Sequence, residues 1–168
     1  MSPAGTIRRS EDGDLEVLNR VLPVWSGHEY AQRLRAQARG QMVQVVAWDR
    51  ALPVGRGMVL FPEHDEFSTS AVRESCAEVR DVFVAPGHRN LGLATAMMAS
   101  LEDAAREHGM VRIGLSVGMD DAALPARLLY ERLGYRHAHG PFLTSTNLLG
   151  EDGPIPVGAV MTYLVKDL

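Results

Sequence analysis

A short glycine-containing turn between an apolar stretch and an amphipathic helix constrains this chain more than any other feature. The apolar stretch, Val82-Phe83-Val84, has the β-branched and aromatic composition of a strand, and a Pro/Gly turn follows it. Downstream, apolar residues recur at the spacing of one helix face: Ala94, Met97, Met98, Leu101 and Ala105. The sequence therefore predicts a strand that leads directly into the N-terminus of a helix packed on a core.

A junction of this kind can bind an anion, because the first amides of a helix lack acceptors and carry the positive end of the helix dipole. Gly92 leaves room for a ligand at the backbone, and Ala94 is small enough for the same approach. Arg89 adds a planar fork of donors for phosphate oxygens. Neither the Lys-Ser/Thr pair of a P-loop nor the three glycines of a dinucleotide fingerprint are present in this turn, so both of those loops are excluded.

The spacing Arg89-x-x-Gly92-x-Ala94 after an apolar strand resembles the motif with which the GNAT superfamily of N-acetyltransferases binds the pyrophosphate of acyl-coenzyme A. A second similarity follows in residues 128–135, which read Leu-Leu-Tyr-Glu-Arg-Leu-Gly-Tyr. In this family a helix with such an ending carries a tyrosine that acts as general acid. The resemblance covers nearly the whole chain and implies that Tyr130 is that acid.

One position departs from the family pattern. The family often has an asparagine seven residues before the tyrosine, where this chain has Ala123. A coenzyme contact from that asparagine is therefore absent, or it is supplied by Asp120 or Asp121.

The resemblance also implies how acetyl-coenzyme A binds as the acyl-donor cosubstrate, with no metal ion. Backbone amides of Val82, Phe83 and Val84 would bind the pantetheine arm, and one of them would polarise the thioester carbonyl. The pyrophosphate would lie against the turn and the helix start, which comprise Arg89, Asn90, Leu91, Gly92, Leu93, Ala94 and Thr95.

The base that accepts the amine proton is less determined. Glu78 stands where some members of the family keep a catalytic glutamate, and an ion pair with Arg80 is its alternative role. Strand alternation predicts Glu78, Arg80 and Val82 on one face, and Asp81 with Phe83 on the other. Asp81 and a water chain without a dedicated side chain remain open as alternatives.

Composition bounds the remaining choices. The chain has 168 residues, of which 46% are apolar. We therefore expect residues 1–168 to form one domain with a substantial core. A net charge of −4 without a basic block disfavours nucleic acid, and Cys76, the single cysteine, excludes an internal disulfide and multi-cysteine metal sites. No run of about twenty apolar residues occurs, so we expect a soluble, cytoplasmic protein that does not span a membrane.

The expected fold class is α/β, a single GNAT-like domain with a mixed sheet of about seven strands flanked by about four helices. The expected strands cover 6–9, 41–48, 52–61, 77–84, 111–117, 135–138 and 159–165. The expected helices cover 12–22, 29–38, 92–108 and 124–133. Gly55 and Gly57 indicate a bulge in the third strand, and the last two strands are separated by a long loop rich in Gly and Pro.

The predicted function is transfer of an acetyl group to a primary amine, directly within a ternary complex. Cys76 lies outside the strand–helix junction, so a covalent route through it is not expected. The acceptor is expected to be a small molecule. A protein N-terminus or lysine, and a non-catalytic acyl-coenzyme A sensor, are the alternatives. A homodimer also remains open. Four residues, Trp25, His28, Glu29 and Tyr30, either form one wall of the acceptor pocket, as the resemblance implies, or pack the helices.

Overall fold

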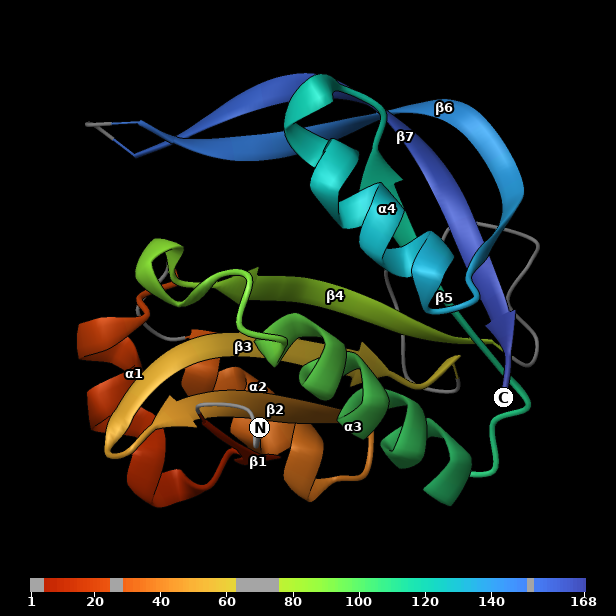
Figure 1. The fold of residues 1–168 in the computed structure, drawn as a ribbon. Helices are drawn as coiled ribbons and strands as arrows, with labels where there is room; N and C mark the ends of the chain where they lie inside the picture. Colours follow the sequence, from red (N-terminus) through yellow and green to blue (C-terminus); the bar gives the residue numbers. More distant parts are fainter. Residues whose placement is uncertain (1–4, 25–28, 63–75, 151–152) are drawn as a thin grey trace. The chain divides into compact units, whose positions relative to one another are not determined.

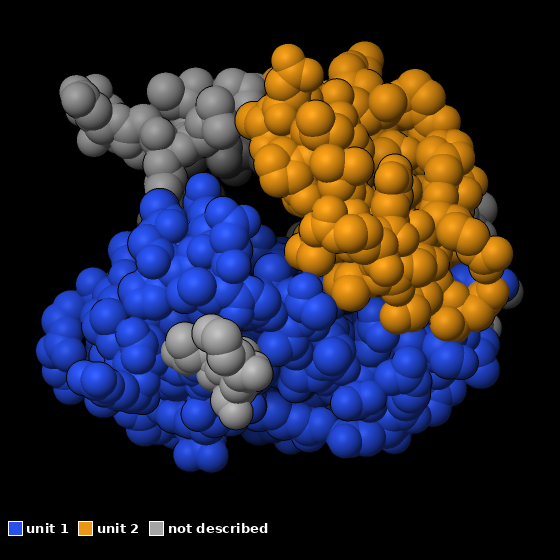
Figure 2. Space-filling model, viewed as in Figure 1, with its two compact units in different colours: residues 1–113, 168 blue, residues 114–167 orange. Residues whose placement is uncertain are grey.

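The computed structural model describes residues 5–24, 29–62, 76–150 and 153–168, with only the backbone for 146–150 and 153–157. These residues form seven strands of a mixed sheet and four α-helices (Figure 1). The predicted α/β class is confirmed. The chain divides into two compact units, residues 1–113 with 168 and residues 114–167 (Figure 2). That residues 1–168 form one domain stays a prediction.

The first unit contains an antiparallel sheet in the order β1-β2-β3-β4. Helix α3 covers one face of this sheet, and α1 and α2 cover the other (Figure 1). The elements are β1 (Thr6–Arg9), α1 (Leu15–Val21), α2 (Glu29–Ala38), β2 (Met42–Asp49), β3 (Leu52–Leu60), β4 (Cys76–Val84) and α3 (Leu93–Glu107).

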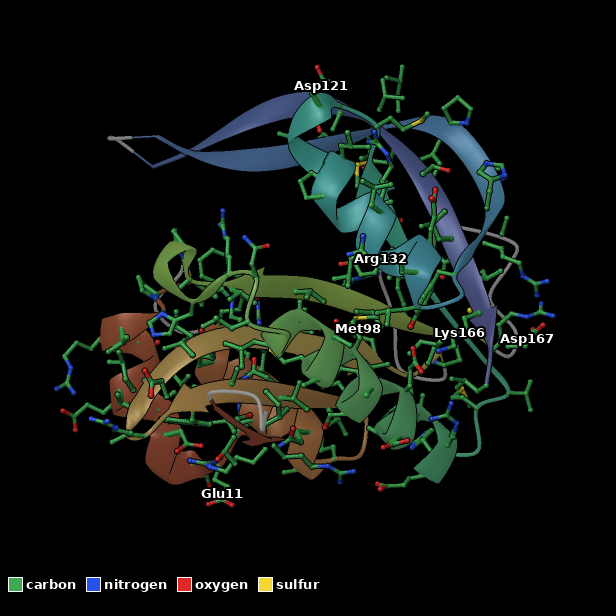
Figure 3. All side chains as sticks on the ribbon, viewed as in Figure 1. Glu11, Met98, Asp121, Arg132, Lys166 and Asp167 are labelled. Atoms are coloured by element: carbon green, nitrogen blue, oxygen red, sulfur yellow. The ribbon has the colours of Figure 1, made fainter. Side chains whose placement is uncertain are left out.

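The apolar stripe of α3 is buried as its spacing predicts. Met97, Met98 (labelled in Figure 3) and Leu101 are each fully buried. Two glycines of β3 admit the helix to the sheet: a Cβ on Gly55 would lie 3.3 Å from Met97 Cε, and one on Gly57 would lie 3.3 Å from Leu101 Cδ1. These glycines therefore serve close helix–sheet packing.

The bulge predicted in β3 is confirmed: the register with β2 shifts between Ala47 and Trp48, so that Val54, next to Gly55, is an extra residue on β3. A second bulge, which the sequence did not indicate, belongs to β4. The register between β3 and β4 shifts at Gly57, so that Asp81 and Val82 of β4 lie opposite this one glycine. Asp81 has a φ of 53°, in the left-handed region that non-glycine residues rarely adopt. The two glycines of β3 therefore lie beside two bulges, one in β3 itself at Val54 and one in the facing strand β4 at Asp81.

The second unit contains three strands in the order β5-β7-β6. Its elements are β5 (Arg112–Gly118, of which the first two residues fall in the first unit), α4 (Leu124–Arg132), β6 (Arg136–Gly150) and β7 (Gly153–Asp167).

The long loop predicted between the last two strands is instead a pair of 15-residue strands, β6 and β7, separated by residues 151–152. The prolines that suggested a loop include Pro154 and Pro156, which lie opposite Leu149 and Asn147 near the tip of the hairpin. The seven residues of β5 lie beside the later half of β7, where the Met119 amide donates to the Val160 carbonyl oxygen. Among the described residues, the earlier half of β7 therefore has one edge without a partner strand, and a residue lacking an N–H fits on such an edge.

Gly114 of β5 gives a stability prediction, because it lies against the ring of Tyr163 in β7. A Cβ there would be 2.5 Å from Tyr163 Oη and 2.7 Å from Cε1, and this ring is only 7% exposed. We expect Gly114→Ala to lower the free energy of unfolding by about 1–3 kcal/mol, the usual cost of overpacking, in urea denaturation. Gly158→Ala in β7 is the matched control, because its Cβ would meet nothing within 4 Å. Equal losses in both variants would contradict the packing argument.

Candidate active site

The turn between β4 and α3 has an open backbone surface. After a single 3-10 turn (Pro86–His88), Asn90 and Gly92 both adopt left-handed conformations, with φ of 61° and 79°. Gly92 is the N-cap of α3 and offers no side-chain cap. The first amides of α3 therefore have no intrahelical acceptor and no side-chain cap from this residue, and residues 89–92 are exposed.

Arg89 is tied to the end of β4. Its Nε donates a hydrogen bond to the carbonyl oxygen of Val84, the last residue of β4, at 3.0 Å. The rest of its exposed guanidinium forms no hydrogen bond or ion pair with the described residues. The strand end thus orients the arginine and leaves two terminal nitrogens for an external anion.

The charges around the turn favour an anion as well. The first turn of α3 contains no acidic residue that would neutralise the helix dipole. The nearest ion-pair geometry is between His88 Nε2 and Asp49 Oδ2, 3.4 Å apart. Uncapped amides, a positive helix end and an oriented guanidinium together form a site suited to phosphate groups.

The bulge at Asp81 changes the predicted faces of β4. Asp81 and Phe83 lie on the side of the sheet that faces α2. Asp81 binds Arg33 of α2. The ring of Phe83 packs against Arg56, whose guanidinium carbon lies 4.9 Å from the ring centroid. Val82 faces the other side, against Gly57. The predicted partition fails because the extra residue reverses alternation downstream of it.

Glu78 lies upstream of the bulge. It is opposite Leu60 in the register, and Arg80 is opposite Met58, so both share the α2-facing side of the sheet with Asp81. The Glu78 carboxylate accepts a hydrogen bond from Arg80 Nε at 2.9 Å and its side chain is 16% exposed. The pairing expected as its alternative role is therefore present.

Tyr130 belongs to the second unit, at the last turns of α4. It is 8% exposed and packs edge-on against Tyr135 with ring centroids 5.9 Å apart. Burial raises the pKa of Tyr130 above that of an ordinary phenol. Its hydroxyl makes no hydrogen bond with the described residues. The phenol is thus kept protonated at neutral pH with its donor uncommitted, which suits a general acid.

The start of α4 contains Ala123 and the two aspartates, Asp120 and Asp121, that were considered as substitutes for the asparagine. The Asp120 side chain caps the short turn before α4 by accepting a hydrogen bond from the Ala123 amide at 2.9 Å. Arg127 Nη1 donates to the carbonyl oxygens of Gly118 and Asp120. Asp121 points into solvent (Figure 3). Of the two aspartates, Asp120 is therefore engaged in capping and Asp121 is free of that role.

The structure brings most of the predicted residues together along one continuous segment. Val82–Val84 and Arg89–Thr95 surround the turn in the first unit, with Glu78 on the same strand, whereas Tyr130 belongs to the second unit. Of the residues proposed for the acceptor wall, Tyr30 is fully buried and donates to the Leu22 carbonyl, and Glu29 pairs with Arg33. Trp25 and His28 lie outside the described residues.

Sequence reasoning missed two arginines, Arg33 and Arg56, which both bind Asp81. The spacing of Glu29 and Arg33, four residues apart on a helix, is a signal for one ion pair but not for the contact with β4.

A model of the GNAT acetyltransferase family matches residues 12–135, nearly three quarters of the chain. The chain belongs to the GNAT family of acetyltransferases. The turn and α3 lie inside the matched residues, as do Glu78 and Tyr130. The chain is accordingly an acyltransferase of the GNAT type.

Solved structures share this fold. Phosphinothricin acetyltransferase of Sinorhizobium meliloti, in complex with acetyl-CoA, has a TM-score of 0.69 at 17% identity, over 98% of this chain and 89% of its own. Ribosomal-protein-alanine N-acetyltransferase of Brucella melitensis has a TM-score of 0.69 at 19% identity, over 97% and 99%. An N-acetyltransferase of Staphylococcus aureus Mu50 has a TM-score of 0.71 at 13% identity, over 97% and 98%. At these identities the likeness concerns the fold.

No curated protein matches the chain. Among the described residues, no helix has the length and apolarity needed to cross a membrane. The described side chains also include no group of three or more His, Cys, Asp or Glu residues that could hold a metal ion.

Proposed function

We propose that this GNAT protein transfers the acetyl group of acetyl-coenzyme A to a primary amine by direct transfer in a ternary complex. The observation that carries the proposal is the uncapped start of α3 with the Arg89 guanidinium tied to the end of β4. This arrangement fits a pyrophosphate, which presents several negative oxygens to amides and a guanidinium together. The segment Arg89–Thr95 binds it.

The remaining roles follow from the demands of the reaction. Amides of Val82, Phe83 and Val84 bind the pantetheine arm, and one of them stabilises the oxyanion that forms when the amine attacks the thioester. Tyr130 gives its proton to the departing thiolate of coenzyme A. Its raised pKa supports this role, because the phenol then arrives at the reaction in the protonated form.

Direct transfer is favoured over an acetylated enzyme. Cys76 is only 4% exposed at the start of β4, and its Sγ donates to the Ala77 carbonyl oxygen at 3.5 Å. A buried thiol engaged with its own strand is a poor nucleophile for a thioester. Initial rates with both substrates varied should give intersecting lines, and the intact mass of the protein after exposure to acetyl-coenzyme A alone should stay unchanged. Parallel lines with an acetylated protein would overturn the mechanism.

The acceptor we propose is a small cationic amine. The net charge of −4 attracts a protonated amine and disfavours an acidic partner. Two alternatives remain. A protein acceptor is one, because the structural neighbours include a ribosomal-protein-alanine acetyltransferase beside the phosphinothricin enzyme. A non-catalytic acyl-coenzyme A sensor is the other, since Ala123 replaces the family's asparagine.

Glu78 is our first candidate for the base, and its test is a pH profile. We expect Glu78→Gln to lower kcat/KM at neutral pH, with a loss that shrinks as pH rises toward the pKa of the acceptor amine. The sign follows because a base is needed only while the amine arrives protonated. Glu107→Gln is the control, since this exposed carboxylate pairs with Arg9 at the far end of α3. A Glu78→Gln profile that superimposes on the wild type would leave the proton to another group or to water.

A further inference from the structure

Asp81 lies at the point where β4 departs from regular strand geometry. Its φ of 53° is left-handed, and it forms the extra residue of the bulge opposite Gly57. Such a conformation is unfavourable for a residue with a Cβ, so it persists only where surrounding contacts hold it. The three residues that follow are Val82–Val84, whose amides carry the proposed function.

Two arginines hold the Asp81 carboxylate. Arg56 of β3 binds it in a bidentate manner, with Nε 2.7 Å from Oδ2 and Nη2 3.1 Å from Oδ1. Arg33 of α2 adds a third bond, from Nη1 to Oδ2 at 2.6 Å. The side chains of Arg56 and Arg33 are 12% and 6% exposed and that of Asp81 is 24% exposed, so salt screens these bonds less than it screens ion pairs on the open surface.

Both guanidinium groups are themselves fixed. Arg33 also pairs with Glu29 on its own helix and donates to the fully buried Gln44 of β2 at 3.2 Å. Arg56 lies over the ring of Phe83. One carboxylate of β4 is therefore tied to α2 and β3 directly and to β2 through Arg33, all within the first unit.

We propose that Asp81 is a positioning residue: its carboxylate, held by Arg33 and Arg56, fixes the bulge and thereby sets the direction in which the amides of Val82–Val84 point. The inference rests on the proposed function, because it gives those amides their task. It also assigns Asp81 a role other than that of the base. Both of its oxygens already accept hydrogen bonds from guanidinium groups, and a proton acceptor needs a free lone pair directed at the substrate.

Two substitutions separate the carboxylate from the backbone conformation. Asp81→Asn keeps the shape and the tolerance of left-handed φ but removes the charge that the two arginines bind. Asp81→Gly adopts a φ of 53° without strain but removes the side chain. Asp14→Asn is the matched control, because Asp14 is likewise bound in a bidentate manner by Arg8, at 2.7 Å for both bonds, outside β4.

Calorimetry with two ligands distinguishes positioning from general damage. Acetyl-coenzyme A contacts both the β4 amides and the turn, whereas 3′-phosphoadenosine 5′-diphosphate extends only to the pyrophosphate. We expect both Asp81 variants to bind acetyl-coenzyme A about tenfold more weakly and to lose about 10²-fold in kcat, as for a reacting group misplaced by ~1 Å. Binding of 3′-phosphoadenosine 5′-diphosphate should stay as in the wild type. Asp14→Asn should lower thermal stability and leave both affinities and kcat unchanged.

The outcomes are distinct. Wild-type affinity for acetyl-coenzyme A and wild-type kcat in Asp81→Asn would overturn the inference, and so would an equal loss of both ligands. If Asp81→Gly had the affinity for acetyl-coenzyme A and the kcat of the wild type while Asp81→Asn did not, the role of the carboxylate would be overturned. If Asp81→Asn does not fold, Arg56→Lys, which keeps the charge and loses the bidentate contact, gives the same readout. A wild-type protein that binds neither ligand would instead overturn the proposed function itself.

Discussion

Replacing Tyr130 with Phe is expected to lower kcat by about 10² to 10⁴-fold, the range for losing a positioned general acid. The substitution removes one hydroxyl and keeps the ring that packs edge-on against Tyr135. Because no described residue hydrogen-bonds this hydroxyl, its loss leaves no buried partner unsatisfied and should cost little stability. Stopped-flow thiol release measures kcat, and calorimetry measures the affinity for acetyl-coenzyme A, which should be close to that of the wild type.

Tyr135→Phe is the matched control for Tyr130→Phe. Tyr135 is a second buried tyrosine of the same region, 2% exposed and in contact with Tyr130. Removing its hydroxyl should leave kcat near the wild-type value. A Tyr130→Phe enzyme that turns over like the wild type with a good acceptor would reduce Tyr130 to a packing residue.

The double substitution Arg89→Ala with Gly92→Asp is expected to weaken acetyl-coenzyme A binding by about 10³-fold or more. It removes a charge-assisted contact and places a carboxylate beside the pyrophosphate, and each effect is worth about 2 kcal/mol. The fold should survive, because a Cβ on Gly92 meets nothing within 4 Å. An aspartate at this N-cap also offsets part of the strain of a φ of 79° through the helix dipole.

A matched double variant exists elsewhere in the same unit. Arg39→Ala with Gly40→Asp also removes an arginine and loads a left-handed glycine (φ of 71°) that has open space around it, after the end of α2. It should leave the affinity for acetyl-coenzyme A unchanged. Calorimetry that finds unchanged affinity in a folded Arg89→Ala, Gly92→Asp protein would remove the pyrophosphate from this turn.

The features of the fold that depend on neighbouring residues could be predicted from the sequence. The helix stripe of Met97, Met98 and Leu101 and the glycine at the N-terminus of α3 are visible because their spacing determines which face is buried and where the helix starts. The end of α4 at Arg132 is visible as well, because Gly134 follows it and a left-handed glycine commonly ends a helix.

Features that depend on contacts between distant segments were not visible in the sequence. The bulge at Asp81 is stabilised by Arg33 and Arg56, which are 48 and 25 residues away along the chain. The extension of β6 and β7 follows from their pairing with each other, which outweighs the turn preference of Pro154 and Pro156. The bulge at Asp81 is also why the predicted faces of β4 were wrong, because side chains alternate between the two faces only where no extra residue is inserted.

Acetyl transfer to a panel of amines tests the central claim most directly. Wild-type protein is mixed with acetyl-coenzyme A and each of several small amines, a peptide with a free N-terminal alanine, or a lysine peptide. Thiol release and the mass of the product are recorded together. The account predicts amine-dependent thiol release matched one-to-one by an N-acetylated small amine, and loss of both signals in Tyr130→Phe. Tight binding of acetyl-coenzyme A without transfer to any member of the panel would contradict it and favour a sensor.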